Sequence, residues 1–197
     1  MVAAEEGRNT MANAARRQSP DAGQVAVRQL FIVLYRFPWL FGLWAAMLIG
    51  TALVIQYGFG YPPCELCHWQ RYPYYALVAL TPVLLLARDG RGDTARLRDA
   101  FLLAAAIAFL ASGAIGVYHT GVEHHWWAGP SQCTGALILP DDPEAALKAL
   151  AAKPVVRCDQ PALRILGLSM AAWNALVGIS AGLAALLALL VGPRMRG

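Results

Sequence analysis

Residues 39–57 read WLFGLWAAMLIGTALVIQY, a stretch of apolar and small residues that contains no charged side chain. As an α-helix rising about 1.5 Å per residue it would span about 28 Å, close to the ~30 Å hydrocarbon core of a bilayer. Three more apolar stretches of similar or greater length follow: about Trp69–Ala87, Ala100–Tyr118 and Leu166–Val191. The sequence therefore predicts an all-α membrane protein, a bundle of four transmembrane helices.

The composition supports a membrane protein and argues against an ordinary soluble domain. Hydrophobic residues make up 58% of the 197 residues and charged residues 14%, whereas soluble domains carry about 25% charged residues. Residues 1–29 show no sustained apolar pattern, so we predict a disordered cytoplasmic tail there and the helical domain over residues 30–197. The first apolar stretch begins too late and runs too long for a cleaved signal peptide.

Arginine residues are unevenly distributed around the four predicted helices. They gather before the first helix, between the second and the third, and after the fourth: Arg8, Arg16, Arg17, Arg28, Arg36, Arg88, Arg91, Arg96, Arg98, Arg194 and Arg196. Because basic residues are retained on the cytoplasmic side, both termini are expected inside and the loops at about 58–70 and 119–165 outside. The net charge of +4 follows from this asymmetry and gives no reason to expect a nucleic-acid partner.

All four cysteines fall in the two predicted outer loops, Cys64 and Cys67 in the first and Cys133 and Cys158 in the second. An even set of cysteines in an oxidising compartment normally forms disulfides, and four cysteines allow three connectivities. A Cys64–Cys67 disulfide would close only a short loop, so it is a poor structural staple but suits reversible thiol–disulfide exchange. Arg71 follows Cys67 by about one helical turn, where a guanidinium favours the thiolate.

Other classes of protein remain as alternatives. The cysteine pairs would also serve as inert structural disulfides. Cys64, Cys67 and His68, with a further outer histidine or cysteine, would also form a zinc or copper site. No metal is expected, however, because Cys133 and Cys158 are 25 residues apart, unlike the closely spaced ligand pairs of structural zinc sites. A transporter is disfavoured because the predicted helices contain almost no ionisable side chains.

Four short segments around the cysteines resemble a known family. They are Pro63–Arg71 (PCELCHWQR), Tyr118–Glu123 (YHTGVE), Trp127–Pro130 (WAGP) leading to Cys133, and Cys158-Asp159 followed by Leu166–Met170 (LGLSM). In their order and spacing they resemble the DsbB family of bacterial inner-membrane disulfide bond formation proteins, over about residues 38–192. This resemblance implies a four-helix membrane domain whose two outer loops lie in the periplasm.

The same resemblance implies that the cysteines form a relay. A periplasmic thioredoxin-fold protein of the DsbA type would attack the Cys133–Cys158 disulfide at Cys133. Cys158 would then exchange with Cys64, which frees Cys67 as a thiolate facing a membrane quinone. On this hypothesis the four cysteines are the catalytic residues of a protein-disulfide:quinone oxidoreductase.

A membrane quinone, either ubiquinone or menaquinone, is the implied electron acceptor, with Arg71 and His119 as the residues that bind it. A DsbA-type protein has a reduction potential of about −120 mV, and each 30 mV uphill costs about 1.4 kcal/mol for two electrons. An ordinary dithiol would therefore not reoxidise it, whereas a quinone would. The vitamin K epoxide reductase-like family is the alternative within this chemistry, but its Cys-x-x-Cys comes late in the chain, and Cys64–Cys67 comes directly after the first predicted helix.

Overall fold

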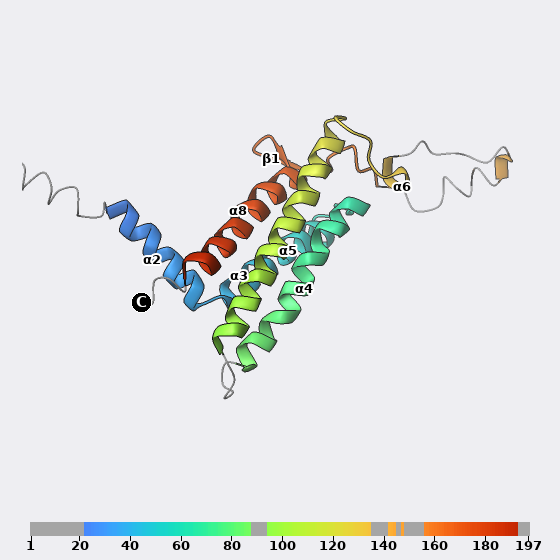
Figure 1. Ribbon diagram of the computed structural model, residues 1–197. Helices are drawn as coiled ribbons and strands as arrows, with labels where there is room; N and C mark the ends of the chain where they lie inside the picture. Colours follow the sequence, from blue (N-terminus) through green and yellow to red (C-terminus); the bar gives the residue numbers. More distant parts are fainter. Residues whose placement is uncertain (1–21, 88–93, 135–141, 145–146, 148–155, 193–197) are drawn as a thin grey trace, which may run out of the picture.

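The computed structural model describes residues 22–87, 94–134, 142–144, 147 and 156–192. Its helices are α2 (Ala22–Arg36), α3 (Trp39–Leu53) with the π-helical continuation η1 (Val54–Gly58), α4 (Glu65–Ala87), α5 (Thr94–Glu123), the short α6 (Ser131–Thr134) and α8 (Met170–Val191). An antiparallel hairpin of β1 (Arg164–Ile165) and β2 (Leu168–Ser169) precedes α8. Figure 1 shows α5 lying between α4 and α8, with α6 and the hairpin at one end of the bundle.

The four predicted transmembrane helices are confirmed as α3 with η1, α4, α5 and α8. Among the described residues, three helices are long and apolar enough to cross a membrane: Trp39–Gly58, Thr94–Glu123 and Met170–Val191. α4 is of comparable length, with 23 residues, although its first two turns are polar. Large apolar side chains point outward along the bundle, with Ile107 60% and Leu190 54% exposed, as expected of surfaces that face lipid.

The predicted outer loops at about 58–70 and 119–165 contain helical turns in the structure. α4 begins at Glu65, and α5 continues to Glu123, so His119 lies on a helix where the sequence indicated a loop. The last turn of α5 is buried, including Val122 and Glu123. Packing against the cysteine-containing segments therefore stabilises helical turns that hydropathy alone assigns to the outside.

The predicted start of the fourth helix at Leu166 is also wrong, because α8 begins at Met170. Leu166 and Gly167 have φ angles of 53° and 83°, which make a two-residue turn of the kind that closes β-hairpins. Ser169 then caps α8, and its hydroxyl accepts a hydrogen bond from the backbone N–H of Ala172 at 3.2 Å. An apolar run therefore contains a turn that hydropathy does not reveal.

The predicted disordered tail over residues 1–29 is wrong for residues 22–29, which form the first half of α2. Residues 1–21 lie outside the described residues. The second half of α2 packs against the bundle through Phe31, Leu34 and Tyr35, while Val25 and Val27 stay exposed. Packing at one end therefore holds α2 against the bundle.

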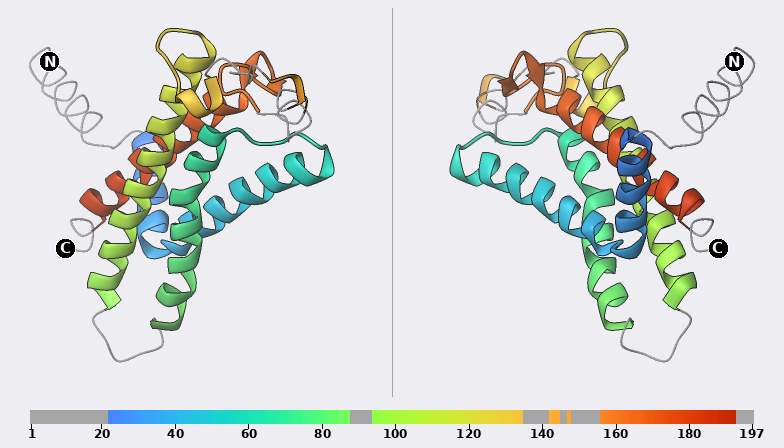
Figure 2. Two further views of the ribbon diagram at one scale, coloured as in Figure 1. Left: turned by 90° about the vertical axis from the view of Figure 1, so that its right-hand side faces the viewer. Right: turned by 90° about the vertical axis from the view of Figure 1, so that its left-hand side faces the viewer.

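Helices α5 and α8 touch through their backbones at the centre of the bundle. A Cβ atom added to Gly113 would lie 2.9 Å from the backbone nitrogen of Ile179, and one added to Gly178 would lie 2.9 Å from the Cα atom of Gly113. Only glycine permits this close approach. Figure 2 shows that α3, in contrast, diverges from α4 toward the end at which α4 begins.

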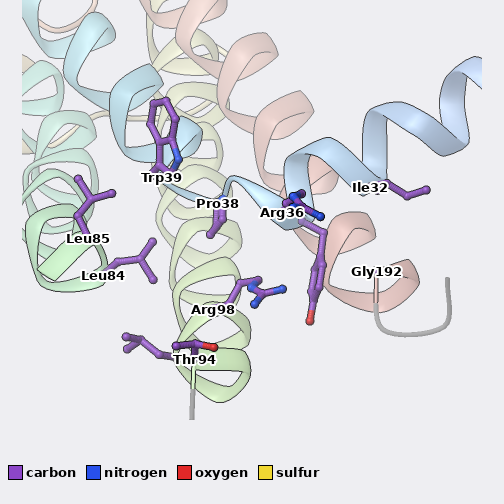
Figure 3. A pocket seen from close by; sticks show the side chains of 11 residues that line it. Ile32, Arg36, Pro38, Trp39, Leu84, Leu85, Thr94, Arg98 and Gly192 are labelled. Carbon is purple, nitrogen blue, oxygen red and sulfur yellow. The ribbon is translucent and has the colours of Figure 1, made fainter. Parts of the chain in front are cut away.

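One cavity lies at the opposite end of the bundle from the cysteines. It has a volume of about 500 Å³ and is lined from α2, α3, α4 and α5. Figure 3 shows Arg36 and Arg98 at this cavity, together with the apolar side chains of Trp39, Leu84 and Leu85. The guanidinium of Arg98 stacks over the ring of Tyr35 at 5.0 Å. None of the residues that line this cavity is a cysteine or a histidine, so it is not the site of the cysteine chemistry.

Candidate active site

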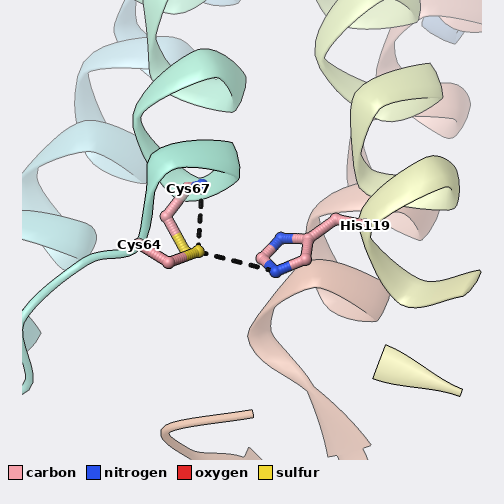
Figure 4. Close-up of side chains that lie close together, drawn as sticks. All are labelled: Cys64, Cys67 and His119. Carbon is pink, nitrogen blue, oxygen red and sulfur yellow. Dashed lines mark hydrogen bonds between the residues drawn. The ribbon is translucent and has the colours of Figure 1, made fainter. Parts of the chain in front are cut away.

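Cys64 and Cys67 lie at the N-terminus of α4, where an extended segment becomes a helix. Cys64 is the N-cap residue, and its sulfur accepts a hydrogen bond from the backbone N–H of Cys67 at 3.4 Å. The two sulfurs are 3.0 Å apart as free thiols, and Figure 4 shows them beside His119. The hydrogen bond that Cys64 donates to the Cys67 sulfur, together with burial, raises the pKa of the Cys64 thiol. Cys67 is therefore the sulfur of the pair that becomes a thiolate more readily.

The second pair, Cys133 and Cys158, forms a disulfide with its Cα atoms 5.4 Å apart. Cys133 lies on α6, and its carbonyl oxygen accepts a hydrogen bond from the N–H of Cys158 at 3.1 Å. Both cysteines are buried in one cluster with Cys64, and Cys67 packs against this cluster. The structure therefore brings all four predicted cysteines together, although they come from segments far apart in the sequence.

His119 lies between the two cysteine pairs. Its Nε2 atom is 3.6 Å from the sulfur of Cys64 and 3.2 Å from the carbonyl oxygen of Cys158. Its Nδ1 atom is 2.8 Å from the side-chain nitrogen of Gln70. The ring is 3% exposed, so its hydrogen-bonding partners are protein groups. The predicted site residue His119 is thus close to both pairs.

Arg71 lies one turn after Cys67, as the spacing predicted, and its guanidinium donates to Gln56 Oε1 on η1 at 2.7 Å. Two adjoining cavities of about 90 and 160 Å³ lie between α3, α4 and α8. Both are lined by Cys67 and Arg71, together with apolar residues of α3 and α8. In the cavity of about 160 Å³, Cys67 is the one thiol and Arg71 the one cation among mostly apolar lining residues. This lining suits a quinone, whose ring is apolar and whose carbonyl oxygens accept hydrogen bonds.

The sulfurs of Cys64 and Cys67 and a ring nitrogen of His119 lie within 4.8 Å of one another, a grouping that would suit a metal ion. Three protein ligands are typical of catalytic zinc sites, which keep one position open, whereas structural zinc sites use four. The group as described has these three members. The metal alternative therefore keeps a definite set of ligands that an experiment can test.

A set of hydrogen-bonded polar side chains beside these cysteines was not predicted from the sequence. It consists of Gln70, Ser112 and Asn174, which lie on three different helices and bond to one another. Glu123 is also buried next to His119, and its Oε2 atom has no hydrogen-bond partner among the described residues. The signal in the sequence was the presence of amide side chains within otherwise apolar helices, which is costly unless they are bonded.

A membrane helical bundle that holds two cysteine pairs together, next to an apolar cavity with an arginine, defines a class of membrane thiol–disulfide oxidoreductase. The family model of disulfide bond formation protein DsbB matches residues 35–190, most of the chain, and the chain belongs to this family. It is therefore a multi-pass membrane protein and a protein-disulfide:quinone oxidoreductase. The resemblance seen in the sequence is confirmed, in preference to the vitamin K epoxide reductase-like alternative.

Relatives among known proteins agree with this family. Disulfide bond formation protein B 1 of Pseudomonas putida is 34% identical over 142 residues, which cover 70% of this chain and 79% of that protein. An uncharacterized protein of Rickettsia prowazekii is 29% identical over 133 residues, 66% of this chain and 73% of that protein. No solved structure matches the chain.

Proposed function

We propose that this protein reoxidises a periplasmic DsbA-like dithiol protein and passes the electrons through Cys133–Cys158 and then Cys64–Cys67 to a membrane quinone, ubiquinone or menaquinone. The observation that carries the proposal is the single buried cluster of cysteines, which lies beside cavities lined by Cys67 and Arg71. Neither pair alone would connect a protein substrate to a quinone in the bilayer.

The proposed relay begins with two thiol–disulfide exchanges. A thiolate of the partner attacks the sulfur of Cys133, and Cys158 leaves as a thiolate. Cys158 then attacks the sulfur of Cys64 in the oxidised Cys64–Cys67 pair, and Cys67 leaves as a thiolate. The second thiol of the partner next attacks the mixed disulfide, which releases the partner as a disulfide and Cys133 as a thiolate. Cys133 then attacks Cys158, which re-forms the Cys133–Cys158 disulfide and frees Cys64, so that each exchange forms one S–S bond and breaks one. Because Cys133 is only 4% exposed, the partner reaches its sulfur only if α6 moves away from the cluster.

Arg71 is proposed to hold the quinone. Its guanidinium would donate a charge-assisted hydrogen bond to a quinone carbonyl oxygen, and it would also stabilise the Cys67 thiolate one turn away. A bound quinone supplies the final acceptor, which takes up two electrons and two protons. His119 is proposed to act at the boundary between this site and the cysteine pairs.

The proposed location is the bacterial inner membrane, with both termini in the cytoplasm and all four cysteines in the periplasm. The support is the distribution of arginine, which is dense at the end of the bundle that carries Arg36 and Arg98. The cysteines lie at the other end, where an oxidising compartment would allow the disulfide relay to operate.

The test is quinone reduction by purified protein supplied with a reduced DsbA-type partner. A partner that keeps only its attacking cysteine is expected to be trapped as a mixed disulfide on Cys133, because it has no second thiol to release itself. Cys158→Ser leaves Cys133 without a disulfide to attack and is expected to form no such adduct. Cys67→Ser is expected to abolish quinone reduction. Ser131→Ala, on the same short helix as Cys133, serves as a control and is expected to behave as the wild type. Trapping mainly on Cys64 would contradict the proposed order.

The metal alternative is tested on the same preparation. Metal analysis of the reduced protein is expected to find less than one ion per chain, with quinone reduction intact. One tightly bound zinc or copper ion per chain, lost together in Cys64→Ser and His119→Ala and accompanied by no quinone reduction, would support the metal site instead.

A further inference from the structure

A continuous chain of hydrogen bonds crosses the bundle from α4 to α8, back to α4 and on to α5. The hydroxyl of Tyr74 donates to Asn174 Oδ1 at 2.9 Å, and Asn174 Nδ2 donates to Gln70 Oε1 at 2.8 Å. Gln70 Nε2 then donates to Nδ1 of His119 at 2.8 Å. Ser112 supports the chain, because its hydroxyl donates to the carbonyl oxygen of Gln70 at 2.7 Å. Gln70, Ser112, Tyr74 and His119 are all at most 6% exposed.

Backbone carbonyl groups determine the direction of this chain. An amide side chain has two ends of similar shape, so its orientation follows from its partners. Asn174 Nδ2 also faces the carbonyl oxygen of Ser112 at 3.1 Å, and Gln70 Nε2 faces that of Leu66 at 3.3 Å. A carbonyl oxygen only accepts, so both of these ends are NH₂ groups. Gln70 therefore donates to Nδ1 of His119, which must be unprotonated.

The neutral ring of His119 consequently carries its proton on Nε2. That N–H points to the carbonyl oxygen of Cys158 at 3.2 Å, again a group that only accepts, and to the sulfur of Cys64 at 3.6 Å. Nε2 is 3.8 Å from a carboxylate oxygen of Glu123, beyond hydrogen-bonding distance. The partners of the two ring nitrogens, Gln70 at Nδ1 and the carbonyl oxygen of Cys158 at Nε2, thus require the same tautomer. Its N–H lies between the two cysteines that the proposed relay joins.

We propose that Gln70 and Asn174 are positioning residues that hold His119 as the Nε2–H tautomer, so that this N–H donates to the sulfur of Cys64 during exchange with Cys158. The proposal rests on the proposed function and assigns a role to two residues that do not themselves touch the reacting sulfurs. His119 is the residue that does, because its N–H faces Cys64 directly.

The N–H matters most when the sulfur of Cys64 carries charge. When the thiolate of Cys133 attacks Cys158 in a Cys64–Cys158 disulfide, the Cys133–Cys158 bond forms and Cys64 leaves as a thiolate. A donor already oriented toward that sulfur stabilises the developing charge without reorganisation. An unprotonated Nε2 would instead direct a lone pair at the thiolate and at the carbonyl oxygen of Cys158, and would oppose the step.

The first test identifies the tautomer without partner or quinone. Protein labelled with ¹⁵N in the histidine rings is studied by NMR in detergent, and the signals of His119 are assigned by their loss in His119→Asn. The wild type is expected to show a protonated Nε2 and an unprotonated Nδ1. A protonated Nδ1 would overturn the proposal. Gln70→Met keeps the side-chain length but cannot donate, and is expected to populate both tautomers.

The second test measures the exchange between pairs. The rate at which the Cys64–Cys158 disulfide is resolved by Cys133 is followed by acid quench and peptide mapping. Gln70→Met removes a hydrogen bond between two neutral groups, which predicts a decrease of about two- to tenfold. Asn174→Leu, which acts from another helix, is expected to show a smaller decrease in the same step. Thr120→Val, which removes a hydroxyl bonded to the carbonyl of Gly116 at 2.8 Å, is the matched control.

These outcomes separate the inference from the proposed function. If the wild type fails to reduce quinone, the proposed function fails, but the tautomer and the exchange rate still test the role of Gln70. If the wild type reduces quinone and both Gln70→Met and Asn174→Leu exchange as fast as Thr120→Val, the positioning role is wrong while the relay stands.

Discussion

Arg71 combines two contacts that make it the most informative single residue of the candidate site. It lies one turn after Cys67 on α4, and it bonds Gln56 on η1 at 2.7 Å, which ties α4 to the end of the diverging α3. An arginine near the hydrocarbon region is costly unless it is bonded or reaches the interface. A hydrogen bond from the guanidinium of Arg71 to a quinone carbonyl oxygen would help to offset this cost.

We predict that Arg71→Ala raises the apparent KM for quinone by about ten- to a hundredfold, the effect of losing one charge-assisted hydrogen bond. Exchange between the partner and Cys133 should remain nearly unchanged. Arg71→Lys keeps the charge but loses the planar fork, so its defect should be milder. The measurement is steady-state quinone reduction with varied quinone, and Arg164→Ala on the hairpin is the control. Unchanged kinetics in Arg71→Ala would place the quinone elsewhere.

The Cys64–Cys67 pair predicts a difference in pH dependence between its two thiols. Because the hydrogen bond to Cys67 and burial raise the pKa of Cys64, its thiolate should appear only at a pH above that of an ordinary cysteine. In a variant lacking Cys133 and Cys158, iodoacetamide should label Cys67 first at neutral pH. Labelling of Cys64 should still rise above pH ~9, where a thiol with the ordinary cysteine pKa of about 8.5 is already mostly ionised.

Peptide mapping by mass spectrometry at several pH values measures this order. The unfolded protein is the control, in which both cysteines should react at similar rates and with similar pH dependence. Faster labelling of Cys64 than of Cys67 in the folded protein at neutral pH would contradict the conclusion that Cys67 becomes a thiolate more readily than Cys64.

At the scale of elements, the crossing of α5 and α8 decides the geometry of the site. Gly113 and Gly178 allow the two backbones to touch, and this contact places Asn174 on α8 within 3.0 Å of the hydroxyl of Ser112 on α5. A larger residue at the crossing would separate the helices and lengthen those bonds. The polar chain to His119 thus depends on two glycines that have no chemistry of their own.

We predict that Gly178→Ala lowers the thermal stability of the protein in detergent, by the roughly 1–3 kcal/mol typical of overpacking a close contact. Gly50→Ala on α3 is the matched control. A Cβ atom there meets no atom within 4 Å, so the better helix propensity of alanine should leave stability unchanged or slightly raised. Thermal unfolding followed by circular dichroism measures both variants. Equal stability of the two variants would show that α5 and α8 can move apart at Gly113 and Gly178 without loss of stability.

At the scale of the whole molecule, charge and redox chemistry are segregated to opposite ends of the bundle. The four cysteines and His119 cluster at one end, and Arg36 and Arg98 line the large cavity at the other. This polarity matches a protein that takes electrons on the oxidising side of a membrane and retains arginine on the other side.

We predict that a reporter active only outside the cytoplasm is active when fused after residue 130 and inactive when fused at residue 93. The reason is the arginine asymmetry, which retains the segment between α4 and α5 in the cytoplasm. A cytoplasm-active reporter should give the opposite pattern and serves as the control. Activity of the first reporter at residue 93 would reverse the orientation and remove the oxidising environment from the cysteines.

The sequence alone determined the class of fold and the chemistry that is local in the chain. Apolar stretches identify the membrane helices, since crossing a bilayer requires length and hydropathy that a linear sequence displays directly. Cys64, Cys67 and Arg71 lie within two turns, so their spacing was enough to indicate a redox-active pair with a cation. The helix ends were less certain, because α2, the hairpin and the last turn of α5 depend on packing.

Only the tertiary structure decided how the cysteine pairs meet and how His119 is oriented. Gln70 and His119 are 49 positions apart, and Gln70 and Asn174 are 104 apart, so no local pattern reveals that they bond. Hydropathy records the cost of a polar side chain in an apolar helix but not the partner that offsets it. The partner is set by which helix faces are in contact, and in this bundle the glycine contact between α5 and α8 sets those faces.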